Sequence, residues 1–122
     1  MLAATHRLRR PADFRAVIRS GRRLGDRLTV VYVAPARGPQ QLSDAVAKTA
    51  PTWQAGLVVS KAVGNSVVRH RVARRLRAVL AALLPRLGEP KMVVVRALPA
   101  AAKATYSELE RSVGKCLRQA AC

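Results

Sequence analysis

The residues best suited to chemistry lie in one basic stretch, residues 61–77 (KAVGNSVVRHRVARRLR). It holds six lysine and arginine side chains and no acidic residue. Guanidinium groups form bidentate hydrogen bonds with phosphate and stack on bases, so the arginine bias favours nucleic acid, RNA in particular. A basic helix without acidic residues cannot form i,i+4 ion pairs, and this argues against a basic face that has no function beyond contact with solvent. The six basic residues are Lys61, Arg69, Arg71, Arg74, Arg75 and Arg77.

Residues that could support catalysis by the chain itself are scattered. His6 and His70 both lie inside basic runs, and the six acidic residues are dispersed along the sequence. A metal-dependent nuclease needs clustered carboxylates, and a histidine-based one needs an acid–base pair. Cys116 and Cys122 are too few for a disulfide framework or a four-cysteine zinc site, and they indicate reduced thiols in a cytosolic protein. The sequence therefore predicts no catalytic residue and no metal site, and His70 is expected to contact phosphate.

The elements that must position the basic stretch can be read from hydrophobic periodicity. The pattern predicts helices over 11–20, 67–84 and 105–119, and strands over 28–34, 53–60 and 91–98. Apolar residues of the middle helix fill one arc about 120° wide, which leaves the arginines on the remaining faces. Ser66 is the expected N-cap of this helix, and Thr105 with Glu108 is typical of a capping box. The order predicts an α+β sandwich, in which helices pack on one small sheet.

Length and charge limit the class of protein. The 122 residues suit a single domain, with a basic N-terminal arm over 1–10 and a flexible insertion loop over 37–52. A net charge of +17 destabilises a compact state unless a polyanion offsets it. Nucleic acid is the leading partner, and an anionic membrane surface is second. The longest apolar run is too short to span a bilayer, and the first residues do not form a signal peptide.

Two aromatic residues form a second candidate site. Phe14 belongs to the first helix and Tyr32 to the first predicted strand, in a chain with only four aromatic residues. Bases of single-stranded RNA stack on aromatic side chains that a sheet or an adjacent helix displays. Spacing alone favours a core role for Phe14, and it leaves open which face of the sheet carries Tyr32. The sequence also leaves two interpretations of the N-terminal arm, which either becomes ordered on binding RNA or remains solvated.

The segment AGLVVSKAVGNSVVRHRVARRLR resembles the signature of the protein component of bacterial ribonuclease P. That family has a strand ending in Ser-Lys, a Gly-Asn turn and a helix with an Arg-Asn-Arg motif, whose middle residue is His70 here. The resemblance covers about residues 7–118, apart from the loop. It implies a fold like domain 2 of ribosomal protein S5, with a left-handed βαβ crossover that carries the basic helix.

The same resemblance implies a function. The chain would be an accessory subunit of a ribonucleoprotein endoribonuclease that removes the 5′ leader of precursor tRNA, while the catalytic RNA and its Mg²⁺ perform the hydrolysis. No obligate protein partner, no membrane and a cytoplasmic location are implied. The residues facing the catalytic RNA would be Lys61, Asn65, Arg69, His70, Arg71, Arg74 and Arg75. The residues facing the leader would be Phe14, Ile18 and Tyr32, with Ile18 where the family often has a second aromatic.

Other classes of nucleic-acid-binding protein share part of this pattern. A structural RNA-binding protein of the ribosomal type has the same charge and size. A DNA-binding regulator would need a short helix before the recognition helix, whereas a strand precedes residues 67–84. Membrane association through residues 78–84 would need an aromatic anchor and a stronger amphipathic pattern. The ribosomal-type protein is therefore the principal alternative.

Overall fold

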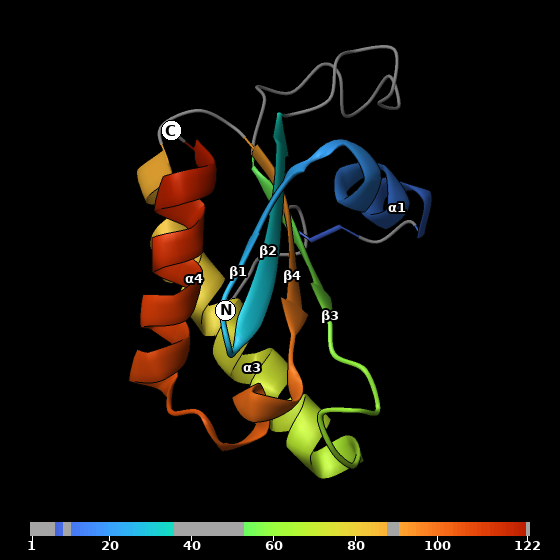
Figure 1. Ribbon diagram of the computed structural model, residues 1–122, viewed down its shortest axis with the longest axis vertical. Coiled ribbons are helices and arrows are strands. Elements are labelled where there is room, and N and C mark those ends of the chain that lie inside the picture. Colours follow the sequence, from blue (N-terminus) through green and yellow to red (C-terminus); the bar gives the residue numbers. More distant parts are fainter. Residues whose placement is uncertain (1–6, 9–10, 36–52, 88–90, 122) are drawn as a thin grey trace.

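The computed structural model describes residues 7–8, 11–35, 53–87 and 91–121, and Figure 1 shows their arrangement. Within these residues, four strands form one sheet, three α-helices pack on it, and two short 3-10 helices, η3 and η4, join elements in the C-terminal half. In chain order the elements are α1 (Pro11–Ser20), β1 (Arg22–Gly25), β2 (Thr29–Pro35), β3 (Gln54–Val58), α3 (Ser66–Leu83), η3 (Leu84–Leu87), β4 (Lys91–Ala97), η4 (Pro99–Lys103) and α4 (Tyr106–Ala121).

The sheet is mixed, with the strand order β1-β2-β4-β3. Strand β2 pairs antiparallel with β1 and β4, and β3 pairs parallel with β4. The parallel pair is connected through α3, so the basic helix lies on the crossover, as predicted. The α+β sandwich is thereby confirmed, whereas the left-handedness of the crossover stays a prediction.

The sheet separates two apolar clusters. Helices α3 and α4 cover one face over the larger cluster, which includes Val31, Val93 and Val95 from the two central strands. Helix α1 lies on the other face, over the smaller cluster around Val17, Tyr32 and Val94 (Figure 1). Alternate residues of β2 and β4 therefore point into different clusters, as the two-residue period of a strand requires. The resulting three layers place α1 and α3 on opposite faces of the sheet.

All six predicted elements are confirmed to within one or two residues at each end, including the strand predicted over 53–60, which is observed as Gln54–Val58. The apolar arc of α3 is also confirmed, because Val72, Leu76 and Val79 are fully buried. Strand β1 was not predicted, since its sequence RRLG has neither β-branched residues nor a clear alternation. This segment is a strand because it pairs with β2, and that pairing cannot be predicted from the four residues themselves.

The predicted N-terminal arm (1–10) and the predicted insertion loop (37–52) fall largely outside the described residues. The loop 37–52 lies wholly outside them. Of the arm 1–10, the structure describes Arg7 and Leu8, which lie beside β3. The Leu8 N–H donates to the Ala55 carbonyl at 2.8 Å, and the Leu8 side chain is buried. This part of the arm therefore extends the sheet at its β3 edge.

Candidate nucleic-acid interface

The turn before α3 presents two of the predicted site residues. Lys61 and Asn65 are both exposed, and Asn65 rather than Ser66 is the N-cap of the helix. The Asn65 Oδ1 accepts a hydrogen bond from the Val68 N–H at 3.0 Å, which commits one side of this amide to the cap. A Cβ at Gly64 would lie 2.9 Å from Val68 Cγ1, so the turn requires glycine to enter the helix this closely.

Three motif residues on α3 lie toward solvent to different degrees. His70 and Arg74 are exposed, and Arg69 is half-buried. The Arg69 Nε is buried and has no hydrogen-bond partner among the described residues, so this part of the guanidinium is held against the protein. His70 and Arg74, one turn apart on α3, thus share an exposed side of the helix, and the turn before it exposes Lys61.

Arg71 and Arg75 differ from the other arginines because they bind the protein itself. The Arg75 Nη1 donates to the Ala104 carbonyl at 2.7 Å, and the Arg71 Nη2 donates to the Ala102 carbonyl at 3.3 Å. Both carbonyls belong to the connection between β4 and α4, in or directly after η4. The two side chains are half-buried and tie α3 to this connection. The sequence predicted only an RNA role for them, because a bond to a carbonyl about thirty residues away has no local signal.

The leader-facing residues predicted from the sequence lie on the opposite face of the sheet. Phe14 packs against the smaller cluster, and a Cβ at Gly56 would overlap its ring, so β3 needs glycine there. Ile18 is 41% exposed, whereas Tyr32 is only 6% exposed. The structure therefore brings Phe14 and Tyr32 into one cluster. Ile18 is the one of the three with a large accessible surface.

Two arginines that the sequence analysis did not single out share this sheet face. The register places Arg23 beside Tyr32, and Tyr32 beside Val94, so these side chains point to the same side. In a neighbouring row, Arg96 of β4 pairs with Val30 and shares the face. Arg23 and Arg96 are both exposed. An exposed arginine on a central strand means that α1 leaves this part of the face open, and strand register was the information needed to find it.

The described residues do not suit a resident metal ion. No group of three histidine, cysteine, aspartate or glutamate residues lies close enough together among them to hold one.

Glu108 completes the predicted capping box, because its Oε1 accepts from the Thr105 N–H at 2.9 Å. These bonds lower the pKa of Glu108. Burial raises the pKa of the Cys116 thiol, with the nearby Asp26 charge acting in the same direction. No helix in the described part of the chain has the length and hydrophobicity to cross a membrane.

The fold and these basic surfaces define a small α+β RNA-binding protein. The Ribonuclease P family model matches residues 2–121. The ribonuclease P protein component of Corynebacterium urealyticum is 48% identical over 126 residues, which cover 96% of each chain. That of Micrococcus luteus is 50% identical over 125 residues, covering 97% of this chain and 92% of the relative. The chain therefore belongs to the ribonuclease P protein family.

Solved structures agree at the level of the fold. The RNase P protein of Staphylococcus aureus superimposes with a TM-score of 0.75 at 23% identity and covers 94% of each chain. That of Thermotoga maritima has a TM-score of 0.73 at 16% identity, covering 93% of this chain and 96% of its own. The predicted family and fold are thus confirmed by independent comparisons of sequence and of structure.

Proposed function

We propose that the protein is the protein subunit of ribonuclease P, which binds the catalytic RNA and the 5′ leader of precursor tRNA and promotes removal of the leader. The observation that carries this proposal is the family match over residues 2–121. The relatives that match over nearly the whole chain are named ribonuclease P protein components, so the ribosomal-type alternative is not favoured.

In this proposal the RNA performs the hydrolysis. The described residues contain no cluster of groups for holding a metal ion, and the carboxylates of Asp26 and Glu108 accept hydrogen bonds from neighbouring groups. Mg²⁺ would therefore be bound mainly by the RNA. The protein contributes positive charge that reduces repulsion between the two RNA strands. A cytoplasmic location and the lack of an obligate protein partner belong to the same proposal.

The catalytic RNA is assigned to the surface at the start of α3. The exposed charges of Lys61 and Arg74, together with the exposed imidazole of His70, support this assignment. The positive end of the α3 dipole adds to the attraction for phosphate. Arg69, which is half-buried, contributes its guanidinium. Arg71 and Arg75 retain donors beyond those used in their carbonyl bonds, because a guanidinium has five.

The leader is assigned to the sheet face that α1 only partly covers. Arg23 and Arg96 supply charge for the phosphates, and Ile18 with the exposed part of Phe14 supplies apolar surface for the bases. Tyr32 forms the floor of this face, because it is almost wholly buried between its neighbours. The leader and the catalytic RNA would then occupy opposite faces of the sheet.

The direct test of the proposal is cleavage of precursor tRNA by the catalytic RNA at low Mg²⁺, with and without the protein. We expect the protein to raise the rate, because its positive charge substitutes for counterions that limit association of two polyanions. Equal rates in the two reactions would contradict the proposal, as would cleavage by the protein in the absence of RNA.

The leader assignment is tested with Ile18→Ala and Arg96→Gln in the assembled holoenzyme. Both side chains are exposed, so neither change should disturb the core. We expect each to weaken binding of precursor tRNA several-fold and to leave the affinity for mature tRNA unchanged. Arg86→Gln is the matched control, since Arg86 is an exposed arginine on η3. Equal loss for both forms of tRNA would contradict the assignment to the leader.

A further inference from the structure

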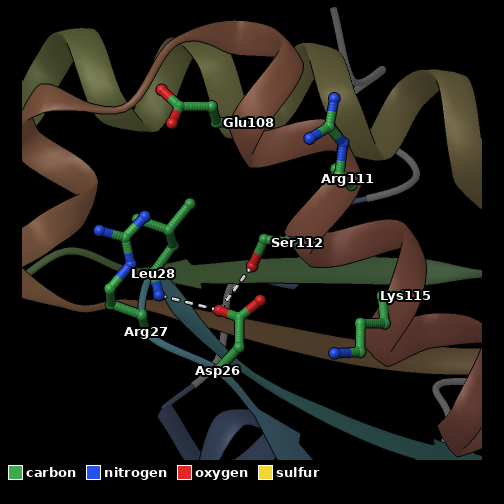
Figure 2. A pocket seen from close by; sticks show the side chains of 7 residues that line it. All are labelled: Asp26, Arg27, Leu28, Glu108, Arg111, Ser112 and Lys115. Atoms are coloured by element: carbon green, nitrogen blue, oxygen red, sulfur yellow. Dashed lines mark hydrogen bonds between the residues drawn. The ribbon is translucent and has the colours of Figure 1, made fainter.

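A hollow between the β1–β2 turn and α4 lies outside both proposed RNA surfaces. Its volume is about 260 Å³, and Figure 2 shows the side chains that line it. The charged and polar ones are Asp26 and Arg27 from the turn, and Glu108, Arg111, Ser112 and Lys115 from α4. Helix α4 is on the sheet face opposite α1, so the hollow and the leader surface lie on opposite sides of the sheet.

The hollow also lies on the flank of α4 that faces away from α3. Gly114 faces α3, because a Cβ there would lie 3.6 Å from Leu83 Cδ1. Ser112, in the hollow, is two residues away from Gly114 and hence about 160° around the helix. The width of α4 therefore separates the hollow from the basic surface of α3. An RNA segment bound in the hollow would not be the one bound at the start of α3.

The two carboxylates of the hollow are engaged within the protein. Asp26 Oδ1 accepts hydrogen bonds from the Leu28 N–H and the Ser112 hydroxyl, each at 2.8 Å (Figure 2). It also accepts from the Thr29 N–H at 3.1 Å. Glu108 closes the cap of α4. Both carboxylates therefore stabilise the walls of the hollow, and neither is arranged with a second acid for binding a cation.

The three cations of the hollow make no hydrogen bond to its carboxylates, although Lys115 lies near the Asp26 charge, and Arg27 and Arg111 lie near that of Glu108. Arg27, Arg111 and Lys115 are exposed, and none of them takes part in the hydrogen bonds that the structure shows among the described residues. Arg111 and Lys115 are four residues apart on α4, so they share one side of the helix. With Asp26 and Glu108 counted against Arg27, Arg111 and Lys115, the lining keeps one net positive charge, and all the donors of the three cations remain available to an anion.

We propose that this hollow binds a backbone phosphate of the RNA that the protein carries, as a third contact separate from the surfaces at α1 and α3. The inference rests on the proposed function for the identity of the RNA. Arg27 and Lys115 would hold the phosphate from the two walls, and Arg111 would contact the adjoining backbone along α4. Asp26 would hold the turn so that Arg27 faces α4.

The test measures binding of the full-length protein to the catalytic RNA at several NaCl concentrations. The variant Arg111→Gln/Lys115→Gln removes two charges from the hollow and no group with a structural hydrogen bond. Each neutralised phosphate contributes about 0.9 to the slope of log affinity against log salt. We expect the slope to fall by about 1 to 2 and the affinity to fall about ten-fold or more at low salt. Arg86→Gln, outside the hollow, should change the slope less.

Unfolding midpoints confirm that the variants are folded before binding is compared. A double variant whose slope and affinity change no more than those of Arg86→Gln overturns the inference. Arg74→Gln separates this failure from failure of the proposed function. If Arg74→Gln weakens RNA binding while the hollow variant does not, only the third contact is wrong. If neither variant weakens binding and the protein does not promote cleavage, the proposed function and the third contact both fail.

Discussion

At the scale of single residues, the arginines of the motif divide into two kinds. Arg71 and Arg75 each donate to a backbone carbonyl near η4, while Arg74 is exposed and donates to no protein group among the described residues. All three have the same side chain and lie on one helix. Their difference arises from what α3 packs against, so charge alone does not define an RNA contact.

This division predicts that Arg75→Ala mainly lowers the stability of the fold, whereas Arg74→Ala mainly weakens RNA binding. Removing Arg75 leaves the Ala104 carbonyl without this donor and should lower the free energy of unfolding by about 1–2 kcal/mol. Removing Arg74 should change it by less than about 0.5 kcal/mol, as for most surface substitutions, while weakening RNA binding. Urea unfolding and RNA titration of both variants measure the two effects. Equal stability of the two variants would show that the Arg75 bond is unimportant.

Glycine at position 56 is a second residue-scale requirement. In Gly56→Ala the new methyl group would overlap the Phe14 ring, and overpacking of this kind costs about 1–3 kcal/mol. Gly114→Ala is the matched control, because its Cβ would meet its nearest neighbour at 3.6 Å and lies in a helix. We expect that control to be neutral or to stabilise the protein by up to about 1 kcal/mol. Thermal unfolding of both variants is the measurement, and a stable Gly56→Ala protein would argue against the Phe14 contact.

At the scale of elements, a buried polar chain fixes α4 to the β1–β2 hairpin. Ser112 donates its single hydroxyl hydrogen to Asp26, so the Thr29 hydroxyl, 2.8 Å away, must donate to Ser112. Thr29 and Ser112 are both buried, so an unpaired hydroxyl there would be costly. This series of hydrogen bonds runs from Thr29 of β2 through Ser112 of α4 to Asp26 of the turn, and it sets the position of α4 against the sheet.

The charge of Asp26 makes this junction sensitive to pH. Burial alone would raise the pKa of Asp26, but the N–H groups of Leu28 and Thr29, the Ser112 hydroxyl and the Lys115 charge together lower it below 3.8. A lowered folded-state pKa stabilises the protein above the unfolded-state value, and this stability is lost as pH falls through the folded-state pKa. Asp26→Asn keeps an acceptor oxygen and lacks the charge. We expect it to be less stable than the parent at pH 6, with the difference shrinking as pH falls through the folded-state pKa of Asp26.

At the scale of the whole molecule, positive charge opposes folding while it favours RNA. The net charge is +17, and the exposed cations of the described residues lie on both faces of the sheet, at α1, α3 and α4. Repulsion among these groups raises the free energy of the compact state, and added salt screens it. We therefore expect the unfolding midpoint to rise between 20 mM and 300 mM NaCl, while RNA affinity falls. A midpoint that decreases over this range would contradict the dominance of self-repulsion.

The sequence alone determined the class of partner, the family and most elements. Net charge, the hydrophobic period of α3 and the Thr105–Glu108 cap depend on composition or on residues within about four positions, so each is visible locally. Strand β1, the burial of Tyr32 and the exposure of Arg96 were decided by the tertiary structure. So were the Arg75 bond to Ala104 and the hollow beside α4. Each of these joins groups distant in the chain, and the register of the sheet and the packing of helices on it determine which groups meet.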